Sequence, residues 1–114
     1  MSERAKRELD AWIEINIFGR DDVTIEPPQN GDVYRVSWDN TKGCVRNFTT
    51  NQNDAMSLLK VCSRRALEMA DMITINECTG SFSVSLYRQI SKHSESAPTL
   101  EIAISLFAKS IFKK

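Results

Sequence analysis

Three cysteines and a single histidine are the side chains of this sequence best suited to nucleophilic or metal chemistry. Cys44, Cys62 and Cys78 lie 18 and 16 residues apart, so they include no close pair of the kind that binds zinc. A catalytic cysteine also needs a base, and His93 stands in the polar run 91–96, which predicts a loop. We therefore expect buried hydrophobic cysteines or surface thiols, and a cysteine-dependent enzyme is the less favoured alternative.

Two groups of charged residues could contact a partner. The segment 20–32 is acidic and contains two prolines and an Asn-Gly turn sequence, and positions 64 and 65 form an arginine pair. The candidate partner-binding residues are Asp21, Asp22, Glu26, Asp32, Arg64 and Arg65. Such carboxylates could imitate phosphates, and such arginines could receive a phosphate or an acidic partner. The alternatives are a solvated connection for 20–32 and a solvated helix face with local ion pairs for the arginines.

Motifs that carry catalysis or cofactor binding are missing from the sequence. It contains no glycine-rich phosphate loop, no His-Glu-x-x-His and no Gly-x-Ser-x-Gly. Asp21 and Asp22 could hold a divalent cation only weakly, because two carboxylates make a poor site. We therefore predict that the protein is not an enzyme and has no catalytic residue, cofactor or metal ion.

Composition predicts one domain that spans residues 1–114. Hydrophobic residues make up 41% and charged residues 26% of the chain, which are ordinary globular values. No apolar run approaches the roughly 20 residues of a membrane-spanning helix, and the N-terminus lacks the features of a secretion signal. We expect an intracellular protein that does not enter a membrane. The 15 basic and 15 acidic residues balance, which disfavours nucleic acid as a partner.

Periodicity predicts the elements that would position these residues. Apolar residues at helical spacing indicate helices over 3–18, 53–70 and 97–112, the last capped by Ser96. Alternating patterns predict one hairpin over 33–39 and 44–49 and a second over 72–78 and 81–88, with a polar loop at 89–96. One face of the second hairpin is apolar and the other is rich in hydroxyls. The last helix is so broadly apolar that it is either central to the core or covered by a partner chain.

These elements predict an α+β fold in the order α-β-β-α-β-β-α. It would be a single small domain in which three helices pack on a mainly antiparallel sheet made of two hairpins. Three stretches also resemble the phage ABA-sandwich domain family: 8–13 leading to 17–19, 48–51 before 54–55 and 58–59, and the closing Pro98, Leu100, 102–103 and Ala108. The chain departs from the family pattern at Arg20, where an aromatic residue is usual, and in its longer acidic loop. The resemblance implies a phage or prophage protein in the bacterial cytoplasm.

The favoured function is a binding protein that contacts a host or phage protein, for example a component of a CRISPR or restriction system. One alternative is a homo-oligomeric structural or regulatory domain that associates through its C-terminal helix or an edge strand. Another is a nucleic-acid-binding accessory protein whose basic residues converge on one face. Those basic residues would be Arg4, Lys6, Arg7, Arg64, Arg65, Arg88 and Lys92.

Overall fold

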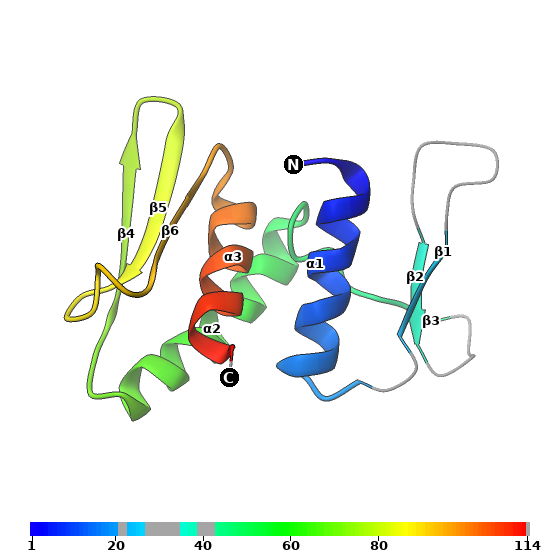
Figure 1. Cartoon of the computed structure of the whole chain (residues 1–114), viewed down its shortest axis with the longest axis horizontal. Coiled ribbons are helices and arrows are strands. Elements are labelled where there is room, and N and C mark those ends of the chain that lie inside the picture. The colour runs from blue at the N-terminus through cyan, green and yellow to red at the C-terminus, as the bar shows by residue number, and fades with distance from the viewer. Residues whose placement is uncertain (21–22, 27–34, 39–42, 114) are drawn as a thin grey trace.

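The computed structural model confirms an α+β fold built from three helices and two groups of antiparallel strands (Figure 1). It describes residues 1–20, 23–26, 35–38 and 43–113, with the backbone alone at 26, 35–38 and 43–44. The elements are α1 (Glu3–Asn16), β1 (Thr24–Glu26), β2 (Arg35–Trp38), β3 (Gly43–Cys44), α2 (Gln52–Glu68), β4 (Ile73–Cys78), β5 (Ser81–Leu86), β6 (Ser94–Ala97) and α3 (Leu100–Phe112).

The strands form two separate sheets with the helices between them (Figure 1). One sheet has the order β1-β2-β3 and lies beside α1, and the other has the order β4-β5-β6 and lies against α3. Each sheet contains one strand beyond the predicted hairpin, and this strand falls in a segment that the sequence predicted to be a loop or connection. β1 lies within 20–32, and β6 begins within 89–96. Both strands are short, at three and four residues, so their alternation is too brief to stand out in the sequence.

Side-chain caps begin all three helices. Ser2 accepts a hydrogen bond from the backbone of Ala5, and Asn51 caps α2 in the same way. The cap of α3 is Thr99, and the prediction of Ser96 was wrong because Ser96 belongs to β6. Gly19 follows α1 with φ +70°, a left-handed conformation that glycine adopts without strain and that the sequence predicted for the end of this helix.

The C-terminal helix α3 is the centre of the hydrophobic core. It contacts α1, α2, β5 and β6. The buried residues of α3 are Ile102, Ala103, Ile104, Ser105, Phe107, Ala108 and Ile111. Other elements of the same chain therefore cover its broad apolar surface. A central position in the core is sufficient to explain that surface.

The segment 45–49 differs from its prediction. The sequence predicts a strand over 44–49, but β3 ends at Cys44 and the chain then runs along α1. Val45, Phe48 and Thr49 are buried there, at 1%, 0% and 2% exposure. The buried positions 45, 48 and 49 do not alternate as those of a strand would, and their burial comes from packing and not from pairing in a sheet.

Candidate functional site

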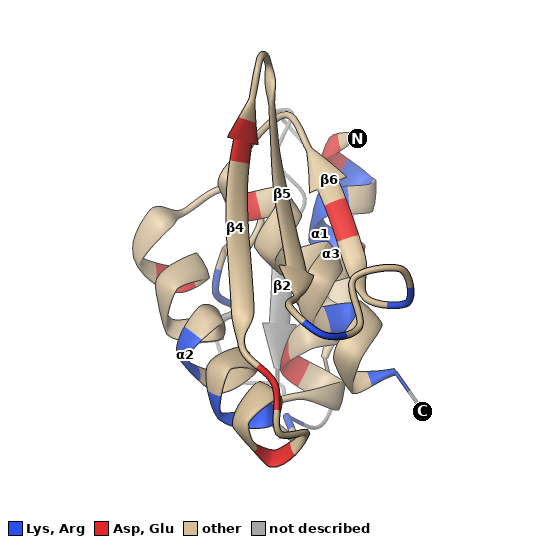
Figure 2. Cartoon of the chain, turned by 90° about the vertical axis from the view of Figure 1, so that its left-hand side faces the viewer, with Lys and Arg blue, Asp and Glu red and all other residues tan. Residues whose placement is uncertain are grey.

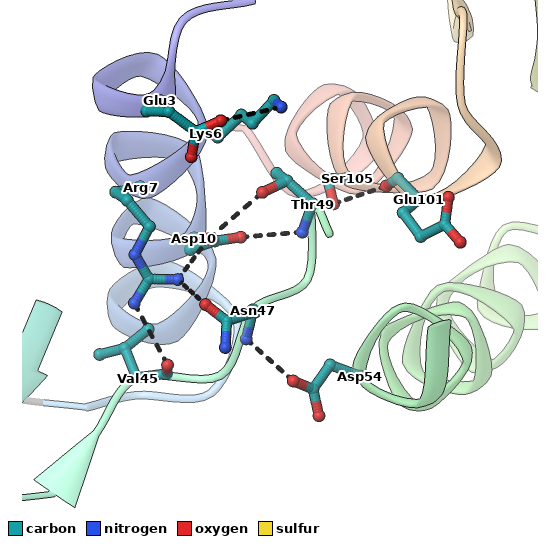
Figure 3. A network of polar contacts seen from close by, with 10 residues as sticks. All are labelled: Glu3, Lys6, Arg7, Asp10, Val45, Asn47, Thr49, Asp54, Glu101 and Ser105. Carbon is teal, nitrogen blue, oxygen red and sulfur yellow. Dashed lines mark hydrogen bonds and ion pairs between the residues drawn. The ribbon is translucent and has the colours of Figure 1, made fainter. Parts of the chain in front are cut away.

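A buried polar network joins α1 to the segment 45–49 (Figure 3). Arg7 donates hydrogen bonds to the Asp10 carboxylate at 2.7 Å, to the side-chain oxygen of Asn47 and to the carbonyl of Val45 at 3.3 Å. Asp10 Oδ1 accepts the backbone N–H of Thr49 at 3.0 Å, and Oδ2, which also binds Arg7, accepts the Thr49 hydroxyl at 3.3 Å. Asp10 is fully buried and Arg7 is 8% exposed, so the ion pair is shielded from water.

A second buried carboxylate lies about one turn further along α1. Glu14 is fully buried and pairs with Arg46 at 2.7 Å. The Arg46 guanidinium also stands 4.1 Å from the ring centre of Phe18 and 5.0 Å from that of Phe48. The two rings are stacked 5.5 Å apart with 4° between their planes. Arg46 therefore binds both a carboxylate and an aromatic pair.

Helical periodicity puts Arg7, Asp10 and Glu14 mostly opposite the apolar stripe of the first helix and so predicts that they face solvent, but the structure buries all three. Their spacing of three and four residues puts them on one face, and 45–49 covers that face. This row of opposite charges at helical spacing is the sequence feature that could have predicted a charged face on the helix. The Arg7 and Asp10 charges pair with one another and hydrogen-bond to 45–49, so they hold two distant segments together, although Arg7 Nε is buried without a hydrogen-bond partner among the described residues.

The structure places only part of the predicted partner-binding set. Asp21, Asp22 and Asp32 lie outside the described residues, as does the side chain of Glu26, whose backbone is in β1. The two arginines lie exposed on the last turns of α2, far from β1 (Figure 1). Arg65 forms an ion pair with Glu68 at 3.2 Å, which matches the alternative of a local ion pair.

The structure describes the side chains of two cysteines and of the histidine. Cys62 is fully buried, and burial raises the pKa of its thiol to about 12. Cys78 is exposed, and the side chain of Cys44 lies outside the described part. His93 Nδ1 lies 3.2 Å from the hydroxyl of Ser110 on α3, a contact between distant segments that the sequence did not reveal. A protonated, buried thiol is a poor nucleophile.

The outer face of the β4-β5-β6 sheet carries uncharged polar side chains, on strands that hold few charged residues (Figure 2). Val84 and Leu86 point inward and are fully buried, so the residues that alternate with them point outward. We call this surface the hydroxyl face, and it consists of Thr74, Asn76, Cys78, Ser81, Ser83, Ser94 and Ser96. Ser85 lies on the same side of the sheet but is buried, at 1% exposure. This confirms the hydroxyl-rich side predicted for the second hairpin and extends it to a third strand.

Charge is kept off the hydroxyl face by the alternation of the strands. The charged residues of β4, β5 and β6 are Glu77 and Glu95. They pair with Phe82 and Val84, which belong to the inner face. Cross-strand hydrogen bonds fix the outer hydroxyls in position, at 2.9 Å between Thr74 and Ser85 and at 2.8 Å between Ser83 and Ser96.

An exposed apolar pair ends the hydroxyl face. Met72 and Tyr87 continue the outward alternation, and the Tyr87 N–H donates to the Met72 carbonyl at 2.8 Å. Their exposed fractions are 60% and 63%. Asp71 fixes the backbone beside them, because its carboxylate accepts N–H groups from Met72 at 2.8 Å and from Arg88 at 2.9 Å and 3.1 Å. The pair is therefore exposed on a rigid backbone.

Comparisons of the chain with protein-family models, with curated proteins and with solved structures find no match. Among the His, Cys, Asp and Glu side chains that the structure describes, no three lie close enough to hold a metal ion. No helix of the described chain is long and apolar enough to cross a lipid bilayer.

Proposed function

We propose that this chain is a non-enzymatic binding protein that acts by protein–protein contact through the hydroxyl face and the Met72–Tyr87 pair. The observation that carries the proposal is the exposure of this apolar pair on a fixed sheet beside uncharged hydroxyls. Tyrosine, serine and asparagine are the residues that protein-binding surfaces favour, because tyrosine gives large contact area and the small polar groups give adaptable hydrogen bonds. A surface without charge also suits the desolvated centre of a protein interface.

The partner that we propose is a host factor of a bacterial defence system, such as a CRISPR or restriction complex. This step rests on the resemblance to the phage ABA-sandwich family and on a phage or prophage origin in the bacterial cytoplasm. The β4 strand supports a protein partner, because it is an edge strand with exposed residues and carries one charged side chain, Glu77. An edge of this kind can pair with a strand of another protein.

The nucleic-acid alternative is disfavoured by the ion pairs of the basic residues. Arg4 pairs with Glu8 at 2.9 Å, and Arg7 is buried against Asp10. Lys6 and Arg65 also have carboxylate partners within 3.3 Å and 3.2 Å. These pairs reduce the positive potential that a phosphate backbone would need.

A homo-oligomer formed through the β4 edge remains the second candidate, because that edge and the Met72–Tyr87 pair are exposed in one chain. Light scattering of the purified protein separates the two. A monomer that binds a defence complex supports the first proposal, and a concentration-dependent dimer that loses association in Tyr87→Ser supports the second.

The experiment that tests the proposed function challenges bacteria carrying an active CRISPR or restriction system with a phage that the system targets. Expression of the wild-type chain should restore plaque formation, and Met72→Ser with Tyr87→Ser should abolish this effect. Ile15→Ser is the matched control, since Ile15 is an exposed hydrophobic residue (44%) on α1. Plaque numbers that never rise above those without the chain, across both systems, would count against the proposed target class.

A further inference from the structure

A cavity of about 330 Å³ opens beside the last turns of α3, where β6 and the loop before it approach the helix. Lys109, Ser110 and Lys113 line it from the helix, and Lys92, His93 and Glu95 line it from the other side. It lies apart from the hydroxyl face, because His93 and Glu95 alternate with the outward Ser94 and therefore point toward the helix.

The cavity is formed by one face at the C-terminal end of α3 and by the loop before β6. Leu106, Lys109, Ser110 and Lys113 follow one another at helical spacing, so they form one face of α3. The His93 carbonyl accepts the N–H of Leu86 at 3.1 Å, and the His93 ring contacts the Ser110 hydroxyl at 3.2 Å. The loop before β6 is thus held to both the sheet and α3.

The cavity carries an excess of positive charge. Its three lysines face a single carboxylate, that of Glu95, and among the described residues no ion pair engages any of the three. Lys109 instead lies 5.6 Å from the ring centre of Trp12. The C-terminal end of α3 contributes roughly half a negative charge, which offsets only part of the lysine charge. A net positive charge of roughly one to two elementary charges therefore remains at the cavity.

We propose that this cavity binds the phosphate group of a small molecule. Lysine binds phosphate as a point charge, and a dianion neutralises more than one lysine at once, which a single carboxylate does not. The Ser110 hydroxyl and the His93 ring add neutral hydrogen-bonding groups beside the ammonium groups. The volume falls at the lower end of ligand pockets, which span about 300–1,000 Å³, so it accommodates phosphate with a small organic group and not a large ligand.

The test is a titration of the isotope-labelled chain, followed by NMR, with inorganic phosphate, adenosine monophosphate and adenosine. The amide signals of 92–95 and 106–113 should shift with both phosphate-bearing probes and stay unchanged with adenosine. Equal affinities identify free phosphate as the ligand, and tighter binding of the nucleotide identifies a phosphate ester. Both results support the site.

Variants make the test specific. Lys109→Gln with Lys113→Gln should weaken nucleotide binding by about tenfold, because two of the three ammonium groups are lost. Lys60→Gln, at an exposed lysine of α2, should leave the affinity unchanged. The proposal is overturned if phosphate and the nucleotide shift no cavity signal at about 10 mM, which corresponds to negligible affinity. It is also overturned if the double variant binds as wild type, or if a single-stranded oligonucleotide binds far more tightly than the nucleotide.

Discussion

The carboxylate of Asp10 accepts both the backbone N–H and the hydroxyl of Thr49, at 3.0 Å and 3.3 Å, although 39 residues separate the two in the chain. Arg7 pairs with the same carboxylate, at the oxygen that accepts the Thr49 hydroxyl. This contact holds the segment 45–49 against α1 and so connects the β1-β2-β3 sheet to the helical core (Figure 3). The buried charges therefore contribute to the stability of the fold, and this contribution can be measured through substitutions and through its dependence on pH.

Asp10→Ala should lower the free energy of unfolding at pH 7 by about 3 kcal/mol, because it leaves the buried N–H and hydroxyl of Thr49 and the guanidinium of Arg7 without the oxygens that accept their hydrogen bonds. Chemical denaturation with urea measures the change. Glu8→Gln is the control on the same helix, since Glu8 forms only an exposed pair with Arg4, and it should change stability by less than about 1 kcal/mol.

Adding Arg7→Met to Asp10→Ala should restore part of the lost stability, because the buried guanidinium that lost its hydrogen-bond acceptor is then also removed. A double variant that is less stable than Asp10→Ala by the full cost of Arg7→Met alone would show that the two residues act independently. That result would contradict the network described here.

The stability of the protein should also depend on the ionisation of Asp10. Burial raises the pKa of Asp10 from 3.8 to about 6, while the hydrogen bonds from Thr49 and the charge of Arg7 act in the opposite direction. The folded state therefore holds this proton more tightly than the unfolded state. The Asp10 contribution is fully present below about pH 4 and is lost as the pH rises through 6, a change of up to about 3 kcal/mol.

Denaturation curves between pH 4 and pH 7, compared for the wild type and Asp10→Asn, isolate this contribution. The difference in unfolding free energy between the two proteins should change across the window and be constant above about pH 7. A difference that is independent of pH would mean that Asp10 ionises in the folded state as it does in the unfolded chain.

The helix α1 shows how far sequence patterns could go. Its extent and its end at Gly19 were predictable, because an apolar stripe and a glycine stop are local features. The burial of Asp10 and Glu14 was not predictable from the stripe alone, since charged residues are usually exposed. Their cover comes from 45–49, more than thirty residues away, and only the tertiary structure brings it there.

Arg46→Ala should destabilise the protein by about 2–4 kcal/mol. The substitution removes the partner of the buried Glu14 and the cation that stands over the Phe18 and Phe48 rings. Thermal unfolding followed by circular dichroism checks the prediction. Arg64→Ala is a suitable control, because Arg64 is exposed on α2. Equal melting temperatures for the two variants would contradict the importance assigned to Arg46.

The thiols should differ in reactivity. Cys62 should resist alkylation by iodoacetamide at pH 8 in the folded protein, because it is fully buried and its pKa is raised to about 12. The exposed Cys78 should react readily. Mass spectrometry of the Cys44→Ser protein measures both sites separately. Rapid labelling of Cys62 in that protein would show that the core opens far more easily than the packing implies.

One part of the candidate surfaces could be predicted from the sequence, and another part could not. The hydroxyl side of the second hairpin followed from strict alternation between Ser81 and Leu86. The strand β6 did not, because Ser94–Ala97 is short and polar, and its place is set by pairing with β5. The contact of His93 with Ser110 depends on that pairing, so no local pattern could reveal the cavity.

The most direct test of the proposed function is the affinity of the purified chain for purified CRISPR and restriction complexes, the proposed target class, measured for the wild type, Tyr87→Ser and Ile15→Ser. Tyr87 is exposed, so its substitution should leave the fold intact, as circular dichroism will check. We predict that Tyr87→Ser weakens binding by about 30-fold, as expected for an aromatic residue at the centre of an interface, and that Ile15→Ser binds as wild type. Equal affinities for Tyr87→Ser and the wild type would contradict the assignment of this face.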